Sequence, residues 1–167
     1  PAAAALALRR RELLAAGGFD ARRFYPAWFD DVDLARRLRE VGAELRYAPA
    51  ARFVHRRGAS VPQLGYGRFL WLYYRNLERY LERHHGRRWA VAARLALIAG
   101  TTLRIALLPL RRPRRARSRA DALRGLAGVV AGAATGWRRP TALRLLFTPP
   151  AELAAAREAD SAPDPAA

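Results

Sequence analysis

The feature that most restricts the fold of this chain is a long amphipathic segment over residues 66–85. Its apolar and aromatic side chains recur at helical spacing, while arginines and glutamates fill the positions between them. This spacing predicts one long helix with an apolar stripe. The stripe consists of Tyr66, Leu70, Tyr73, Leu77, Tyr80 and His84. We expect its aromatic rings to pack against the rest of the protein rather than to form a binding surface.

A second helical pattern lies over residues 31–41, and its first turn is acidic. Asp30, Asp31 and Asp33 fall within four positions of a chain that has 31 basic residues, all arginine, and only 14 acidic ones. Asp33 stands four residues before Arg37, so we expect this pair to be structural. Acids at a helix start often do no more than cap it, which is the alternative to a catalytic role for Asp30 and Asp31.

Short extended segments surround this helix. Residues 2–8 form an apolar run that predicts a buried strand, and residues 44–47 and 52–55 predict two further extended segments. Pro49 lies between the last two and makes one continuous strand improbable. We expect His84 and His85, which have no acidic cluster near them in the sequence, to lie on the surface.

These pieces follow one another in a recognisable order. A helix over residues 10–16 is expected to stop at Gly17 and Gly18, and an aromatic cluster, the acidic helix start and a strand ending in His55 come after it. In this order they resemble the carboxy-terminal half of an inverting family-2 glycosyltransferase, of the rhamnosyl- and galactofuranosyltransferase kind. The matching segments are residues 9–16, 17–20, 24–25, 28–29, 30–34, 45–47, 49–51 and 53–60. The resemblance implies an α/β fold: the carboxy-terminal part of a GT-A, Rossmann-like domain, followed by long amphipathic helices.

The resemblance also implies a reaction. An inverting transfer is a single displacement, so it needs a general base for the acceptor hydroxyl and a positive charge for the departing diphosphate. By resemblance Asp31 is the base and Asp30 orients acceptor or base. His55 is implied as a ligand of Mg²⁺ or Mn²⁺, and imidazole suits Mn²⁺ better. The alternative for His55 is a hydrogen-bonded histidine at the end of a strand.

The acceptor side of the implied site involves four further residues. Gly18 and Asp20 lie near the acceptor in enzymes of this kind, although a helix stop followed by a turn explains them equally well. The ring of Trp28 could stack on a sugar, and Arg56 could neutralise diphosphate charge. The family's nucleotide-binding half, with its metal-binding Asp-x-Asp loop, is not in this sequence. The chain begins at Pro1 and has no methionine, so we expect a fragment that is inactive by itself.

The sequence predicts four regions. Residues 1–62 form the part related to the GT-A catalytic domain, and residues 63–110 form an amphipathic, membrane-associated helical region. Residues 111–148 hold an arginine-rich linker and a short helix, which we expect its glycines to weaken. Residues 149–167 are rich in alanine, proline and acids, and we expect a disordered tail.

Residues 89–110 are apolar and long enough to span a bilayer, apart from Arg94 and Arg104. The leucines, isoleucines and valines favour insertion by about 3 to 5 kcal/mol, but two central arginines oppose it by about 5 to 7. We therefore expect a helix that lies along an anionic membrane surface or packs within the protein, and a membrane-spanning helix is the alternative.

The predicted function is transfer of a sugar from a nucleotide diphosphate donor to a lipid-linked or polysaccharide acceptor, in cell-envelope glycan synthesis. The expected location is cytoplasmic, at the inner face of the cell membrane. A basic, non-catalytic module that binds nucleic acid or anionic membrane is the alternative, since the net charge is +17. That alternative does not explain the clustering of the acids, and we do not expect nucleic acid as a partner. The absence of cysteine excludes disulfides and thiolate metal sites.

Overall fold

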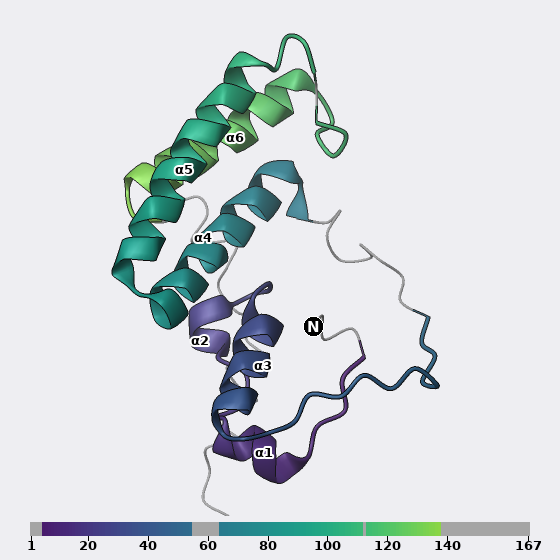
Figure 1. Cartoon of the computed structure of the whole chain (residues 1–167). Helices are drawn as coiled ribbons and strands as arrows, with labels where there is room; N and C mark the ends of the chain where they lie inside the picture. Colours follow the sequence, from purple (N-terminus) through teal and green to yellow (C-terminus); the bar gives the residue numbers. More distant parts are fainter. Residues whose placement is uncertain (1–4, 55–63, 112, 138–167) are drawn as a thin grey trace, which may run out of the picture. The chain divides into compact units, whose positions relative to one another are not determined.

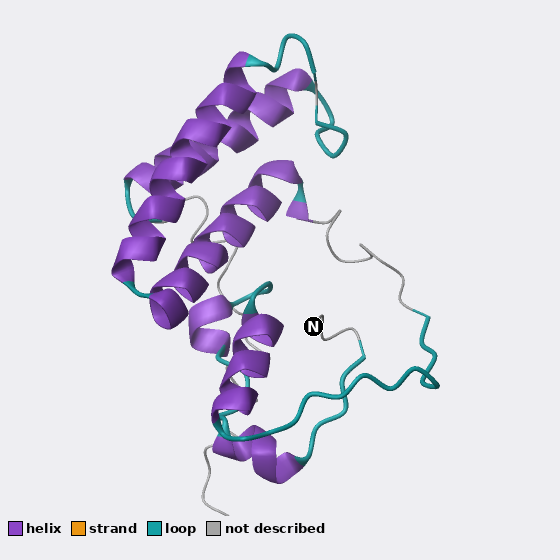
Figure 2. Ribbon diagram, in the orientation of Figure 1, coloured by secondary structure: helices purple, strands orange, loops and turns teal. Residues whose placement is uncertain are grey.

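The computed structural model describes residues 5–54, 64–111 and 113–137. These residues form helices and loops, without a β-strand (Figures 1 and 2). The six helices are α1 (Arg10–Ala15), α2 (Ala21–Phe24), α3 (Asp30–Glu40), α4 (Tyr66–His85), α5 (Arg87–Ala106) and α6 (Arg119–Ala134).

The α/β prediction is therefore wrong for the described part of the chain, which is not a Rossmann-like domain. Residues 5–8, 44–47 and 52–54, where strands were predicted, belong to neither a helix nor a strand. A strand forms only when its backbone groups pair with another strand, and none of the described segments provides that pairing. Phe53 and Val54 are 73% and 95% exposed, so the last of these segments also lacks the burial that would order it.

The predicted helices are confirmed where hydrophobic periodicity was strongest. Helix α4 covers the whole amphipathic segment, and α3 and α1 lie where their patterns placed them. Gly17 and Gly42 follow α1 and α3 with φ of 76° and 80°, a left-handed conformation that costs glycine little. Leu34 and Leu38 of α3 are buried. Together with residues that precede and follow the helix, they form a small apolar core.

Helices α4, α5 and α6 pack against one another, and Gly86 alone connects α4 to α5. Two glycines let α4 and α6 approach closely: a Cβ atom added to Gly125 would lie 2.9 Å from the Cα atom of Gly67. Glycines were expected to weaken α6, but Gly125 has a packing role there.

The buried carboxylate of Glu78 joins the three long helices. Arg94 of α5 donates from Nε to both of its oxygens at 3.1 Å, and Trp137, just after α6, donates from Nε1 at 2.8 Å. The side-chain hydrogen bonds to Glu78 raise the pKa of Arg94. The apolar inner face of α5 is therefore also held to α4 by an ion pair.

Candidate active site

The segment before α3 has an uncommon backbone conformation. Trp28 and Phe29, neither of them glycine, have φ of 70° and 69°. A left-handed conformation at a bulky residue costs about 1–3 kcal/mol and persists only where surrounding contacts impose it. This two-residue left-handed turn leads directly into Asp30 and Asp31, the predicted catalytic acids.

Asn76 of α4 holds this turn in place. Its side chain is fully buried, and its Nδ2 donates to the carbonyl oxygens of Phe24 at 2.8 Å, Ala27 at 2.7 Å and Trp28 at 3.3 Å. Its Oδ1 accepts a hydrogen bond from Nε of Arg75 at 3.0 Å. The amide nitrogen of Asn76, and not its oxygen, must face these three carbonyls, because the amide oxygen would repel all three.

Two arginines of α4 extend this anchoring. Arg75, which is 1% exposed, donates to the carbonyl of Tyr25, and Arg79 donates to that of Arg23. The Arg75-Asn76 pair has no role that the sequence reveals, and the amphipathic pattern places Arg75 off the apolar stripe. Its contacts lie 50 residues away in the sequence, so no local signal could have identified them.

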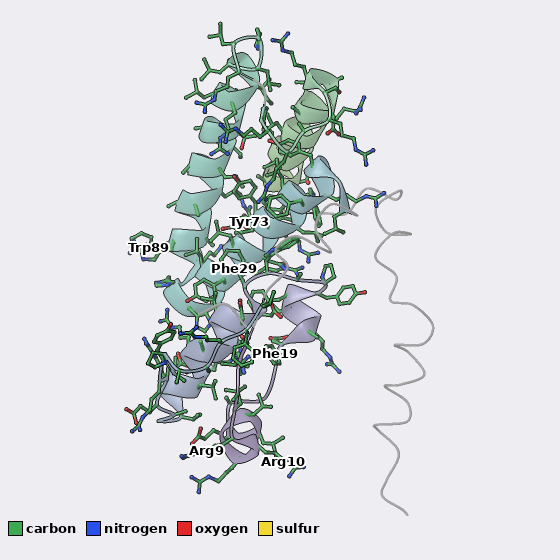
Figure 3. All side chains as sticks on the ribbon, turned by 90° about the vertical axis from the view of Figure 1, so that its right-hand side faces the viewer. Arg9, Arg10, Phe19, Phe29, Tyr73 and Trp89 are labelled. Carbon is green, nitrogen blue, oxygen red and sulfur yellow. The ribbon has the colours of Figure 1, made fainter. Side chains whose placement is uncertain are left out.

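Aromatic rings pack the turn onto α4. The Trp28 ring lies 5.0 Å from that of Phe69 and crosses it nearly at right angles. The Phe29 ring lies next to that of Tyr73 (Figure 3), at 5.2 Å between ring centres. It lies 5.8 Å from that of Tyr80. These contacts support the expectation that the aromatic stripe is used for packing. Stacking of Trp28 on a sugar stays a prediction.

Asp30 and Asp31 are the first two residues of α3, and both are partly exposed. The Oδ1 atom of Asp31 accepts the backbone N–H of Val32 at 2.8 Å, which satisfies one of the free donors at the helix start. That bond agrees with the capping alternative. The residue at the N-cap position itself is Phe29, whose side chain has no group that could cap.

Asp33 has a structural role, as predicted. It is fully buried, accepts from Nε of Arg37 at 2.8 Å and lies 2.7 Å from Nε2 of His84. The prediction of a surface position for His84 is wrong, because its side chain is only 5% exposed. An acid 51 residues away supplies its partner, which the local sequence could not reveal.

The predicted acceptor residues Gly18 and Asp20 are both tied to the scaffold. The carbonyl of Gly18 accepts from Nη2 of Arg37 at 2.8 Å. Asp20 caps α2 by accepting the Arg23 N–H at 3.0 Å, and its carboxylate accepts from Arg83 at 2.7 Å. Burial acts to raise the pKa of Asp20, but the hydrogen bonds from Arg23 and Arg83 outweigh it, so the pKa lies below its usual value of 3.8.

Arg83 brings two of these acids together. Besides Asp20, it contacts the buried carboxylate of Asp33 at 3.4 Å. Asp20 and Asp33 therefore share one cation from α4, and the structure gives both a role in holding α2 and α3 to that helix.

His55 and Arg56 lie outside the described residues, so the convergence of Asp31 and His55 on one pocket stays a prediction. Within the described ranges no three histidine, aspartate or glutamate side chains form a group that could hold a metal ion. The proposed Mg²⁺ or Mn²⁺ site depends on the resemblance alone.

A cleft of about 300 Å³ lies between α4 and α5. Its walls include Leu77, Leu97 and Gly100, and Arg104 donates to the hydroxyl of Tyr74 there at 3.0 Å. Most of the lining surface is apolar, and its one acid, Glu78, already binds Arg94. The cleft therefore offers an apolar surface but no group suited to acid–base chemistry.

Comparisons with known proteins find no matching family model, no matching curated protein and no matching solved structure.

Proposed function

We propose that this chain carries the acceptor-side, base-bearing part of an inverting glycosyltransferase. The donor would be a nucleotide diphosphate sugar, and the acceptor a lipid-linked or polysaccharide glycan of the cell envelope, met at the cytoplasmic face of the membrane. The support is the order of motifs from Gly17 to Ser60, together with the conformation of the turn before α3.

The single observation that carries this proposal is the left-handed turn at Trp28 and Phe29. A serine or asparagine at the N-cap could start the helix without this conformational cost. Here two strained aromatic residues occupy that place, and Asn76 fixes the three carbonyls around them. Strain held in this way is typical of functional sites, and it sets the direction in which the two carboxylates leave the turn.

The proposed chemistry needs only what an aspartate can provide. Asp31 takes the proton of the acceptor hydroxyl while the acceptor oxygen bonds to the anomeric carbon and the bond to the diphosphate breaks. The Val32 N–H on one carboxylate oxygen fixes the orientation of the group. Asp30 would orient the acceptor. The diphosphate would be met by residues of the donor-binding half, for which these 167 residues contain no motif.

The test is Asp31→Asn in the protein that contains the complete enzyme. Asparagine can still accept the Val32 N–H, so the helix start should survive while the base is lost. Transfer should fall by at least about 10²–10⁴-fold, with donor binding unchanged. Asp33→Asn is not a suitable control because Asp33 is buried, so Asp30→Asn serves instead and should cause a smaller loss. Transfer at the wild-type rate by Asp31→Asn would refute the assignment.

A second candidate, an anion-binding module without chemistry, has one specific observation in its favour. Residues 86–137 contain eleven arginines and a single acid, Asp121. Non-specific binding to a polyanion follows from such a charge and weakens steeply with salt. The two candidates are compatible, since one concerns α3 and the other α5 and α6.

A further inference from the structure

The outward face of α5 is apolar and uncovered in the described part of the chain. Between Arg88 and Arg104 every exposed position of this helix is uncharged. These positions are Trp89, Val91, Ala92, Leu95, Ala96, Ala99, Thr102 and Leu103. Their spacing places them on one half of the helix circumference, opposite the buried Ala90 and Thr101. We call this set the α5 face.

The exposure of the large side chains on this face is high. Trp89 and Leu95 are each 62% exposed and Leu103 is 59% exposed, and Leu110, just beyond the helix, is 83% exposed. Leucines scattered singly on a surface need no explanation, but a continuous apolar stripe along a 20-residue helix does. Trp89 points outward from α5 (Figure 3), and an aromatic ring at the end of such a stripe suits a membrane–water interface.

Positive charge stands at both ends of the α5 face. Arg87 and Arg88 precede it, and Arg111, Arg114 and Arg117 follow it, all of them exposed. The one acid of this region, Asp121, is occupied in the start of α6, where it accepts the backbone N–H of Arg117 at 3.0 Å. The surface is therefore apolar along its length and cationic at its ends.

We propose that the α5 face binds an anionic phospholipid bilayer, with α5 lying in the plane of the membrane. The leucines and Trp89 would enter the boundary between headgroups and acyl chains, while the arginines at the two ends bind lipid phosphates. This inference goes beyond the proposed sugar transfer and does not depend on it.

The inner contacts of α5 favour a helix on the membrane over one that crosses it. By length and composition α5 is the one helix of the described ranges that could span a bilayer. Its inner side, however, binds α4 through Arg94 and Glu78 and packs on α6. Crossing would require this ion pair to break or to enter the hydrocarbon region, where each charge is costly.

Other occupants of the face fit the charges less well. A second copy of the chain would bring arginine clusters close together, because both ends of the stripe are cationic. Nucleic acid would leave the leucines against a charged backbone with nothing apolar to contact. An anionic bilayer is the partner that offers both an apolar layer and a layer of negative charge.

The experiment measures co-sedimentation of the full chain with vesicles of phosphatidylcholine, with and without phosphatidylglycerol. The test variant is Leu95→Ser/Leu103→Ser. The matched control is Leu14→Ser, because Leu14 in α1 is 60% exposed and lies off the face. Far-ultraviolet circular dichroism confirms that each variant retains its helices, as expected for substitutions at exposed positions.

We expect binding to anionic vesicles to fall by at least about tenfold in the double variant and to be unchanged in Leu14→Ser. Removal of phosphatidylglycerol should weaken wild-type binding by about fivefold for each arginine that contacts a headgroup. Equal binding by the double variant and the control would overturn the proposal. So would self-association that the leucine variant abolishes while vesicle binding persists, or a preference for duplex DNA over anionic vesicles.

Discussion

The contact between α4 and α6 predicts how alanine at each of two glycines of α6 changes the stability of the protein. Gly125 and Gly128 of α6 are three residues apart, yet only Gly125 is buried. A Cβ atom on Gly125 would meet the Gly67 Cα at 2.9 Å and the Tyr66 Cδ1 at 2.9 Å, whereas a Cβ atom on Gly128 would meet nothing within 4 Å. The same substitution should therefore have opposite effects at the two sites.

The magnitudes follow from two competing terms. Alanine is favoured over glycine within a helix by about 1 kcal/mol, and Gly128→Ala should gain about that much stability. At Gly125 the added methyl group collides with the backbone of the facing helix, so α4 and α6 must separate, and overpacking of this kind costs about 1–3 kcal/mol. Because the blocking atom is backbone, we expect the upper part of that range and a net loss of about 1–2 kcal/mol.

The measurement is urea unfolding of the full chain, followed by the helical circular dichroism signal. Gly125→Ala should lower the midpoint and Gly128→Ala should raise it, with a difference between the two variants of about 2–3 kcal/mol in the free energy of unfolding. If both variants are stabilised equally, α4 and α6 do not approach at Gly67 and the helix packing described here is wrong.

Three further substitutions test the anchoring of α2 and α3 to α4. Asn76→Ala should lower the free energy of unfolding by at least about 1–3 kcal/mol, because buried carbonyls lose their donor. Asn76→Asp should lower it further, because aspartate adds a charge and cannot donate to these carbonyls. Urea unfolding measures both variants. The pKa of Asp20 is lowered in the folded state, so its contribution to stability is present above its unfolded pKa of 3.8 and is lost as the pH falls through the folded value. Asp20→Asn keeps a capping side chain but loses the charge that binds Arg83, so it should destabilise the protein at pH 7 and have a smaller effect at pH 2, as thermal unfolding at the two pH values would show. An equal loss at both would mean that the ion pair with Arg83 does not stabilise the fold.

The candidate site shows where local sequence information stops. The acidic start of α3 and the pair of Asp33 with Arg37 were predictable, because residues four apart in a helix are neighbours. The partner of His84 and the role of Asn76 were not, since their contacts join segments about 50 residues apart. The strand predictions failed for the related reason that a strand requires a distant partner, which a local pattern of apolar residues does not reveal.

Among the described residues, the sequence alone determined where α1, α3 and α4 form. Their apolar periodicity and the glycines that follow α1 and α3 act within a few residues, so they are visible without a fold. Only the tertiary structure decided which faces are covered. It buried Arg75 and Asn76 to hold the turn before α3, used Gly125 to bring α6 against α4, and left Leu95 and Leu103 of α5 exposed. Burial depends on which surfaces meet in space, and that depends on contacts between residues far apart in the chain.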